Sequence, residues 1–133
     1  MIFIDTNIFI RFFVADNSEE HKKVEKFFND VVCGNTKYFT NTMVITEIVW
    51  VLGKYYKMEK NHVCENIRLI LDTPNILIKE IKILHNTVEI FEKQNIDFID
   101  AYNYSYSLMS SSDEIMSYDK DFDKLDMIKR IEP

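Results

Sequence analysis

The sequence predicts an α/β fold, a three-layer α/β/α sandwich built on a central, mostly parallel sheet of four to five strands. Short apolar runs alternate along the chain with longer segments in which apolar residues recur at helical spacing. Because strands separated by helices form parallel sheets that are covered on both faces, this alternation is typical of that class. The chain has 133 residues, of which 47% are hydrophobic, and this suits a single domain over residues 1–133.

The N-terminal part is expected to contain one strand followed by two helices. The apolar run 1–4 favours a buried strand, and residues 8–14 favour a short helix. Asn17 is expected to cap the second helix, because Glu20 stands three residues further on, as in a capping box. Gly34 is expected to end that helix, since glycine tolerates the left-handed conformation often found at a helix C-terminus.

The rest of the chain is expected to continue the same alternation. A helix over 42–56 is expected to be buried on most sides, because apolar residues occur all around it. The next helix, 61–71, is expected to stop before Pro74, since the residue before a proline disfavours helical geometry. Further helices are expected at 80–93 and 97–110, and strands at 37–40, 75–78, 114–117 and 127–131.

The acidic balance of the chain narrows the class of function. The net charge is −6 and the pI is about 5.0, which argues against binding nucleic acid through a broad basic surface. It does not exclude a nuclease, because metal-binding carboxylates themselves make the charge negative. The strongest local basic candidates are Arg11, Lys22, Lys23 and Lys26, although a solvated helix face is the simpler explanation of the lysines.

The chain lacks the features of a secreted or membrane protein. Its N-terminus has no basic leader, and no apolar run approaches the ~20 residues that span a bilayer. Cys33 and Cys64 do not have the spacing of a zinc site, and a disulfide is not expected without signs of secretion. We therefore expect a soluble, cytoplasmic protein that does not contact a membrane.

Four acidic residues stand where the predicted fold can gather them: Asp5, Glu47, Asp100 and Asp119. Asp5 and Asp119 each follow an expected strand, and parallel strands place both at the same edge of a sheet. A carboxylate inside apolar sequence is costly to bury unless it is paired or binds a metal. Because several gathered carboxylates repel one another, a divalent cation is the usual partner for such a group.

Asp5 and Glu47 each have a structural alternative to a role as metal ligand. Asp5 can act as the N-cap of the following helix. Thr6 and Asn7 can hydrogen-bond to carboxylates or backbone while leaving Asp5 free to bind a metal. Glu47 lies inside an apolar stretch and is expected to be buried, so it either binds a metal or is satisfied by Thr46 or a strand end.

The acids near positions 100 and 120 also have structural alternatives to a role as metal ligands. Asp97 and Asp100 can act as a capping pair, because acidic residues are favourable at a helix N-terminus. For Asp100 we favour a functional role, since the first turn of its helix points toward the strand edge. Asp119 and Asp121 begin a run similar to a calcium loop, but Lys124 stands where such a loop has glycine.

Four segments of the chain resemble the motifs of PIN-domain ribonucleases, and within that family those of VapBC toxin–antitoxin toxins. They occur in the family's order and cover nearly the whole chain: 5–8, 46–52, 97–101 and 117–122. The helix of the third motif segment, 97–110, departs from the family, because it continues with tyrosines instead of small residues. Ser117 stands where the family commonly has threonine, and it keeps the hydroxyl group.

This resemblance implies an activity and a set of site residues. It implies that the protein hydrolyses phosphodiester bonds in single-stranded or looped RNA with the help of Mg2+ or Mn2+. It also implies that the protein is a toxin, that it has a cognate antitoxin protein and that it forms a homodimer. The acidic quartet would be Asp5, Glu47, Asp100 and Asp119, assisted by Thr6, Asn7 and Ser117. We add Asp97 and Asp121 as auxiliary acids and Arg11 as a weak substrate-binding candidate.

Two other functions compete with this interpretation. One is a phosphohydrolase that uses Asp5 as nucleophile, but enzymes of the haloacid-dehalogenase type have a second aspartate two residues on, where this chain has Asn7. The other is a catalytically silent domain of the same fold that acts as a binding module. All four acids are present, which argues against the silent domain.

Overall fold

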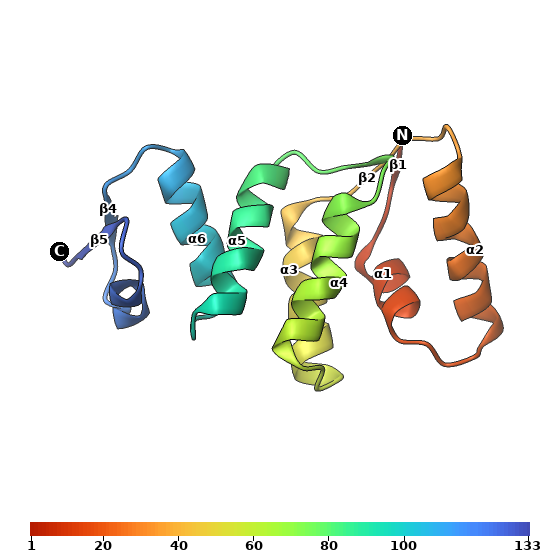
Figure 1. Ribbon diagram of the computed structural model, residues 1–133, viewed down its shortest axis with the longest axis horizontal. Coiled ribbons are helices and arrows are strands. Elements are labelled where there is room, and N and C mark those ends of the chain that lie inside the picture. Colours follow the sequence, from red (N-terminus) through yellow and green to blue (C-terminus); the bar gives the residue numbers. More distant parts are fainter. The chain divides into compact units, whose positions relative to one another are not determined.

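The computed structural model describes residues 1–133 and divides them into two units, Met1–Glu80 and Ile81–Pro133. Each unit has its own parallel strands and its own helices, which Figure 1 colours along the sequence. The α/β class predicted from the alternation of apolar runs is confirmed, and strands occur in all five segments where they were expected. No helix combines the length and the apolar character needed to cross a bilayer.

Three parallel strands organise the first unit: β1 (Ile2–Phe3), β2 (Tyr38–Phe39) and β3 (Ile76–Leu77), in the order β1-β2-β3. Their register pairs Ile2 with Tyr38 and Tyr38 with Ile76. Because the strands are parallel, the helices that follow β1 and β2 both begin at the carboxyl edge of the sheet. At this edge the Thr40 hydroxyl donates to the Ile4 carbonyl oxygen at 3.0 Å.

Helices α1 (Thr6–Phe13) and α2 (Glu19–Cys33) connect β1 to β2. The prediction that Asn17 caps α2 is wrong. Ser18 is the cap, and its hydroxyl accepts a hydrogen bond from the His21 backbone N–H at 3.0 Å. Asn17 has a left-handed backbone with φ of 58°, which an asparagine tolerates and which turns the chain into the helix.

Gly34 ends α2 as expected, but for a different reason. Its φ is −91°, so the left-handed conformation that was expected there is absent. A Cβ atom at this position would lie 2.5 Å from the backbone carbonyl oxygen of Asp30. Glycine is therefore required by the close approach of the chain to the last turn of the helix.

The segment predicted as one helix over 42–56 is divided into α3 (Thr42–Trp50) and a π-helical turn, η1 (Val51–Tyr55). The expectation that it is buried on most sides is also wrong. Met43 is 75% exposed and Trp50 is 62% exposed, so one stripe of the helix faces away from the core. Helix α4 (Lys60–Asp72) then leads to β3, and both elements lie close to their predicted ranges.

The second unit contains two helices, two parallel strands and one 3-10 turn. The helices are α5 (Ile81–Lys93) and α6 (Phe98–Met109), and the strands β4 (Glu114–Met116) and β5 (Lys129–Ile131) flank η2 (Lys120–Lys124). The register pairs Ile115 with Arg130. Six buried side chains form the core beneath α6 and η2: Ile96, Ala101, Tyr104, Phe122, Leu125 and Ile128.

Candidate active-site carboxylates

Asp5 stands directly after the first strand region and directly before α1. It occupies the N-cap position with an extended backbone, but its side chain makes no capping hydrogen bond. The residue is exposed, so its carboxylate stays in contact with water. The capping alternative therefore accounts for the position of Asp5 but not for its carboxylate, which remains available to bind a ligand.

Glu47 is exposed on α3, and the prediction that it is buried is wrong. The buried face of the helix is formed by Val44, Ile45, Ile48 and Val49, whereas Glu47 lies on the stripe with Met43 and Trp50. The apolar neighbours in the sequence concealed this stripe, because only the packing decides which side of a mostly apolar helix faces solvent.

Thr6 connects the first turn of α1 to the middle of α3. Its side chain donates a hydrogen bond to one carboxylate oxygen of Glu47 at 2.5 Å, although the two residues are 41 positions apart. Thr6 is 7% exposed, so this bond is well shielded from water at its donor end. The bond orients the Glu47 carboxylate and leaves its second oxygen free for a ligand.

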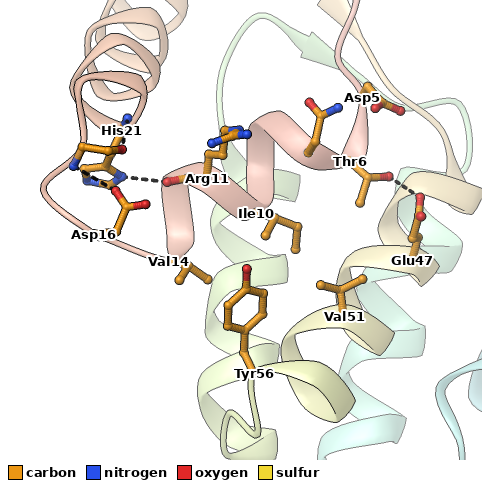
Figure 2. A pocket seen from close by; sticks show the side chains of 12 residues that line it. Asp5, Thr6, Ile10, Arg11, Val14, Asp16, His21, Glu47, Val51 and Tyr56 are labelled. Carbon is orange, nitrogen blue, oxygen red and sulfur yellow. Dashed lines mark hydrogen bonds between the residues drawn. The ribbon is translucent and has the colours of Figure 1, made fainter.

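Asp5 and Glu47 line the same cavity in the first unit, which has a volume of about 520 Å³. Figure 2 shows Asp5 at the start of α1, next to Thr6, whose side chain points toward Glu47 on α3. Asn7, predicted as an assisting residue, and Arg11, the weak substrate-binding candidate, also line the cavity. The guanidinium of Arg11 forms an ion pair with Glu20 of α2.

In the second unit, the structure gathers three carboxylates. One oxygen from each of Asp100, Asp119 and Asp121 lies within 4.8 Å of the others. Asp100 comes from the first turn of α6, Asp119 follows β4, and Asp121 lies in η2. Asp121 was expected only as an auxiliary acid, and the 3-10 turn brings its carboxylate into the same group as the two predicted ligands.

Backbone hydrogen bonds fix the loop that carries Asp119. The Ser117 hydroxyl accepts a hydrogen bond from the Asp119 backbone N–H at 3.0 Å. One oxygen of Asp119 in turn accepts from the Asp121 backbone N–H at 2.9 Å, which caps η2. The second oxygen of Asp119 is not used by this cap. Ser117 thus holds the start of the loop that carries Asp119, and its role as an assisting residue stays a prediction.

The charges in this group act on one another. Partial burial raises the pKa of the Asp100 carboxyl, and the negative charges of Asp119, Asp97 and Asp121 raise it further. Asp97 stands at the N-cap of α6 without a side-chain cap bond and lies outside the group of three. Lys124 offsets part of the repulsion through its ion pair with Asp121 at 2.6 Å.

These donors fit a hard divalent cation. Carboxylate oxygens are the ligands that Mg2+ and Mn2+ prefer, and three of them from separate turns lie close enough to share one ion. Burial and the neighbouring negative charges both raise the pKa of the Asp100 carboxyl, and a cation would offset the part due to the charges. No histidine or cysteine belongs to the group, which argues against zinc.

The four predicted ligands divide equally between the two units of the chain. Asp5 and Glu47 share the cavity of the first unit, and Asp100 and Asp119 share the acidic group of the second. That all four meet at one metal centre stays a prediction. Tyr56 also lines the first cavity, and sequence reasoning missed it because helical periodicity does not describe a π-helical turn.

The family model of the PIN domain matches residues 2–127, which is nearly the whole chain. The chain belongs to the PIN-domain family. This PIN domain is also similar to a curated protein from Aquifex aeolicus (strain VF5), a VapC ribonuclease. The two sequences are 23% identical over 125 residues, covering 94% of this chain and 92% of the relative. The resemblance inferred from the four motif segments is therefore confirmed.

Proposed function

We propose that this PIN domain is a metal-dependent endoribonuclease, the toxin of a toxin–antitoxin module. The observation that carries the proposal is the group formed by Asp100, Asp119 and Asp121, whose mutual repulsion calls for a cation. Membership of the PIN family and similarity to a VapC ribonuclease support RNA as the substrate. Both units of the chain would act as one domain, because the family match extends over both.

The proposed cofactor is Mg2+ or Mn2+, held by Asp5, Glu47, Asp100 and Asp119. When bound, the cation supplies a lowered pKa for the attacking water and neutralises the negative charge on the phosphate. Mg2+ takes only one or two direct carboxylate ligands and retains several waters, so some of the four acids would act through water. Asp121 would complete the set from η2.

The chain's own residues would orient these carboxylates. Thr6 holds one oxygen of Glu47 in place, so that the other oxygen points in a defined direction. Ser117 holds the loop of Asp119 through its backbone N–H. Asn7 would contact the substrate or the ligand water from the cavity wall, and Asp97 would raise the negative field around Asp100.

The proposed partners follow from the same similarity. They are an RNA substrate, a cognate antitoxin protein and a second copy of this chain in a homodimer, and the proposed location is the cytoplasm. An acidic chain with a net charge of −6 lacks a broad basic surface for RNA. Binding of the RNA substrate would therefore depend on the metal and on few cationic side chains, and Arg11 is the candidate among these.

Cleavage of a structured RNA by the purified chain, free of any antitoxin, tests the proposal. We expect cleavage with Mg2+ or Mn2+, none with excess EDTA, and a loss of more than about 100-fold in Asp119→Asn. Asp126→Asn is the matched control, because Asp126 is an exposed aspartate of the same unit outside the acidic group. RNA that stays intact with either metal would overturn the proposal and favour a silent binding module.

A further inference from the structure

The cavity beside Asp5 and Glu47 extends well beyond these two carboxylates. Its volume of about 520 Å³ lies in the range of pockets that hold a molecule the size of a nucleotide. Figure 2 shows an apolar floor from α1 and η1, with polar groups placed around it. The floor is formed by Ile10, Val14 and Val51, and the polar lining residues away from the carboxylates include Arg11 and Tyr56.

The π-helical turn η1 directs Tyr56 into this cavity. The Tyr56 backbone N–H donates to the Val51 carbonyl oxygen at 3.1 Å, the i to i−5 bond of a π-helix. In an α-helix, residues five apart point about 140° away from each other. The wider π-turn brings Tyr56 and Val51 to the same side, and both line the cavity. Single π-turns of this kind frequently occur at functional sites.

The π-turn lies at an open part of the surface. A Cβ atom added at Gly53, in the middle of η1, would have no neighbour within 4 Å. Tyr56 remains 42% exposed, with its phenol group reaching across the cavity toward α1 (Figure 2). The turn therefore displays an aromatic ring to a hollow surface instead of burying it in the core.

Arg11 supplies the positive charge of the cavity. Its guanidinium is paired with Glu20, but the side chains are 49% and 63% exposed. An exposed ion pair contributes little stability, so Arg11 can exchange Glu20 for another anion at small cost. The backbone of Arg11 is held independently, because the buried His21 ring lies 2.7 Å from its carbonyl oxygen and 3.4 Å from Glu25.

We propose that this cavity is a nucleotide subsite for the residue next to the scissile phosphodiester bond. The Tyr56 ring packs against the base, and the Arg11 guanidinium binds the neighbouring phosphate. The inference rests on the proposed nuclease function, since it takes Asp5 and Glu47 as the adjoining catalytic groups. An aromatic ring, a guanidinium and adjoining metal-binding acids together suit a nucleotide better than an apolar peptide side chain.

Binding without cleavage tests the subsite. The parent is the inactive Asp119→Asn chain in Mg2+, the probes are a mixed-sequence single-stranded RNA hexamer and the four nucleoside monophosphates, and calorimetry measures affinity. We expect Tyr56→Ala to weaken hexamer binding about tenfold, whereas Tyr56→Phe stays within about threefold of the parent because it keeps the ring. Leu69→Ala is the control, since Leu69 is 51% exposed and lies outside the cavity, whereas the Tyr55 ring packs against that of Tyr56.

Arg11 is tested with the same probes. Arg11→Gln is expected to weaken hexamer binding about tenfold and to reduce its dependence on salt, because a phosphate contact is lost. Glu20→Gln is expected to tighten binding about twofold, since it frees the guanidinium. In active chains, we expect Tyr56→Ala to change the preferred base at the cleavage site and to raise KM more than it lowers kcat.

The outcomes separate the subsite from the proposed function. The subsite is overturned if the parent binds no probe, or if Tyr56→Ala and Arg11→Gln bind within twofold of the parent. It is also overturned if Tyr56→Ala loses binding to a protein partner while its nucleotide affinity is unchanged. Failure of the proposed function appears elsewhere, as intact RNA with the unmodified chain, and it leaves the binding comparison decisive for the subsite.

Discussion

Replacing Asp100 by asparagine should stabilise the metal-free chain while it abolishes the proposed activity. The substitution removes a partly buried charge that faces Asp119, Asp97 and Asp121. Oxygens of Asp100, Asp119 and Asp121 lie within 4.8 Å of one another, and two unit charges at that distance repel by about 0.9 kcal/mol in water. Salt screening roughly halves each of the two repulsions that asparagine removes, leaving about 1 kcal/mol.

The assay is thermal unfolding of the parent and of Asp100→Asn, each with EDTA and with Mg2+. In EDTA, a gain of about 1 kcal/mol should raise the Tm of the variant by roughly 3–5 °C. Saturating Mg2+ should raise the Tm of the parent and reduce or reverse the difference, because the variant has lost a ligand. Asp126→Asn should match the parent in both conditions, since Asp126 lies outside the acidic group.

The pH dependence has a defined sign. The pKa of Asp100 is raised in the folded chain, so the folded state binds this proton more tightly than the unfolded state does. The difference between Asp100→Asn and the parent should therefore be absent below the unfolded pKa of about 3.9. It should grow as the pH rises to the folded pKa and stay constant above it. An asparagine variant less stable than the parent in EDTA at neutral pH would refute the reasoning.

Five further substitutions, at Thr6, Ser18, Asn17 and Gly34, test the positions that the structure assigns. Thr6→Val should lower RNA cleavage at least tenfold and stability by about 1 kcal/mol, because Glu47 loses its hydrogen-bond donor. Thr6→Ser keeps the hydroxyl and should restore both quantities, which cleavage and Tm assays measure. Ser18→Ala should lower the free energy of unfolding in urea by about 1 kcal/mol, whereas Asn17→Gly should change it by less than about 0.5 kcal/mol. Equal losses of stability in the two variants would contradict the assignment of Ser18 as the cap. Gly34→Ala should cost about 1–3 kcal/mol in the same assay, because its Cβ meets a backbone oxygen, and an unchanged midpoint would contradict this.

Much of the fold could be predicted because its signals are local. The apolar run before Asp5 and the proline at position 74 mark the ends of elements within a few residues of where the structure has them. The cap of α2 was predicted one residue too early, because Asn17 and Ser18 are both good capping residues. Only the backbone angles distinguish them, and those depend on how the chain leaves α1.

The candidate site was predictable in its residue types but not in its contacts. Asp100 and Asp119 could be selected because each stands at the end of an expected element, and the structure places them in one group. The burial predicted for Glu47 failed because an apolar stretch does not say which side of a helix meets solvent. The sequence did not indicate that Tyr56 lines the cavity, since a π-turn changes the direction of the side chains that follow it.

The sequence by itself determined the α/β class and the order of the elements, and it selected the candidate acids, because apolar periodicity and strand ends are properties of neighbouring residues. Only the tertiary structure decided that Thr6 donates to Glu47 across 41 positions, and that a 3-10 turn adds Asp121 to Asp100 and Asp119. The physical reason is that hydrogen bonds and charge repulsion depend on distances of a few ångströms between distant segments, which packing sets and local sequence does not.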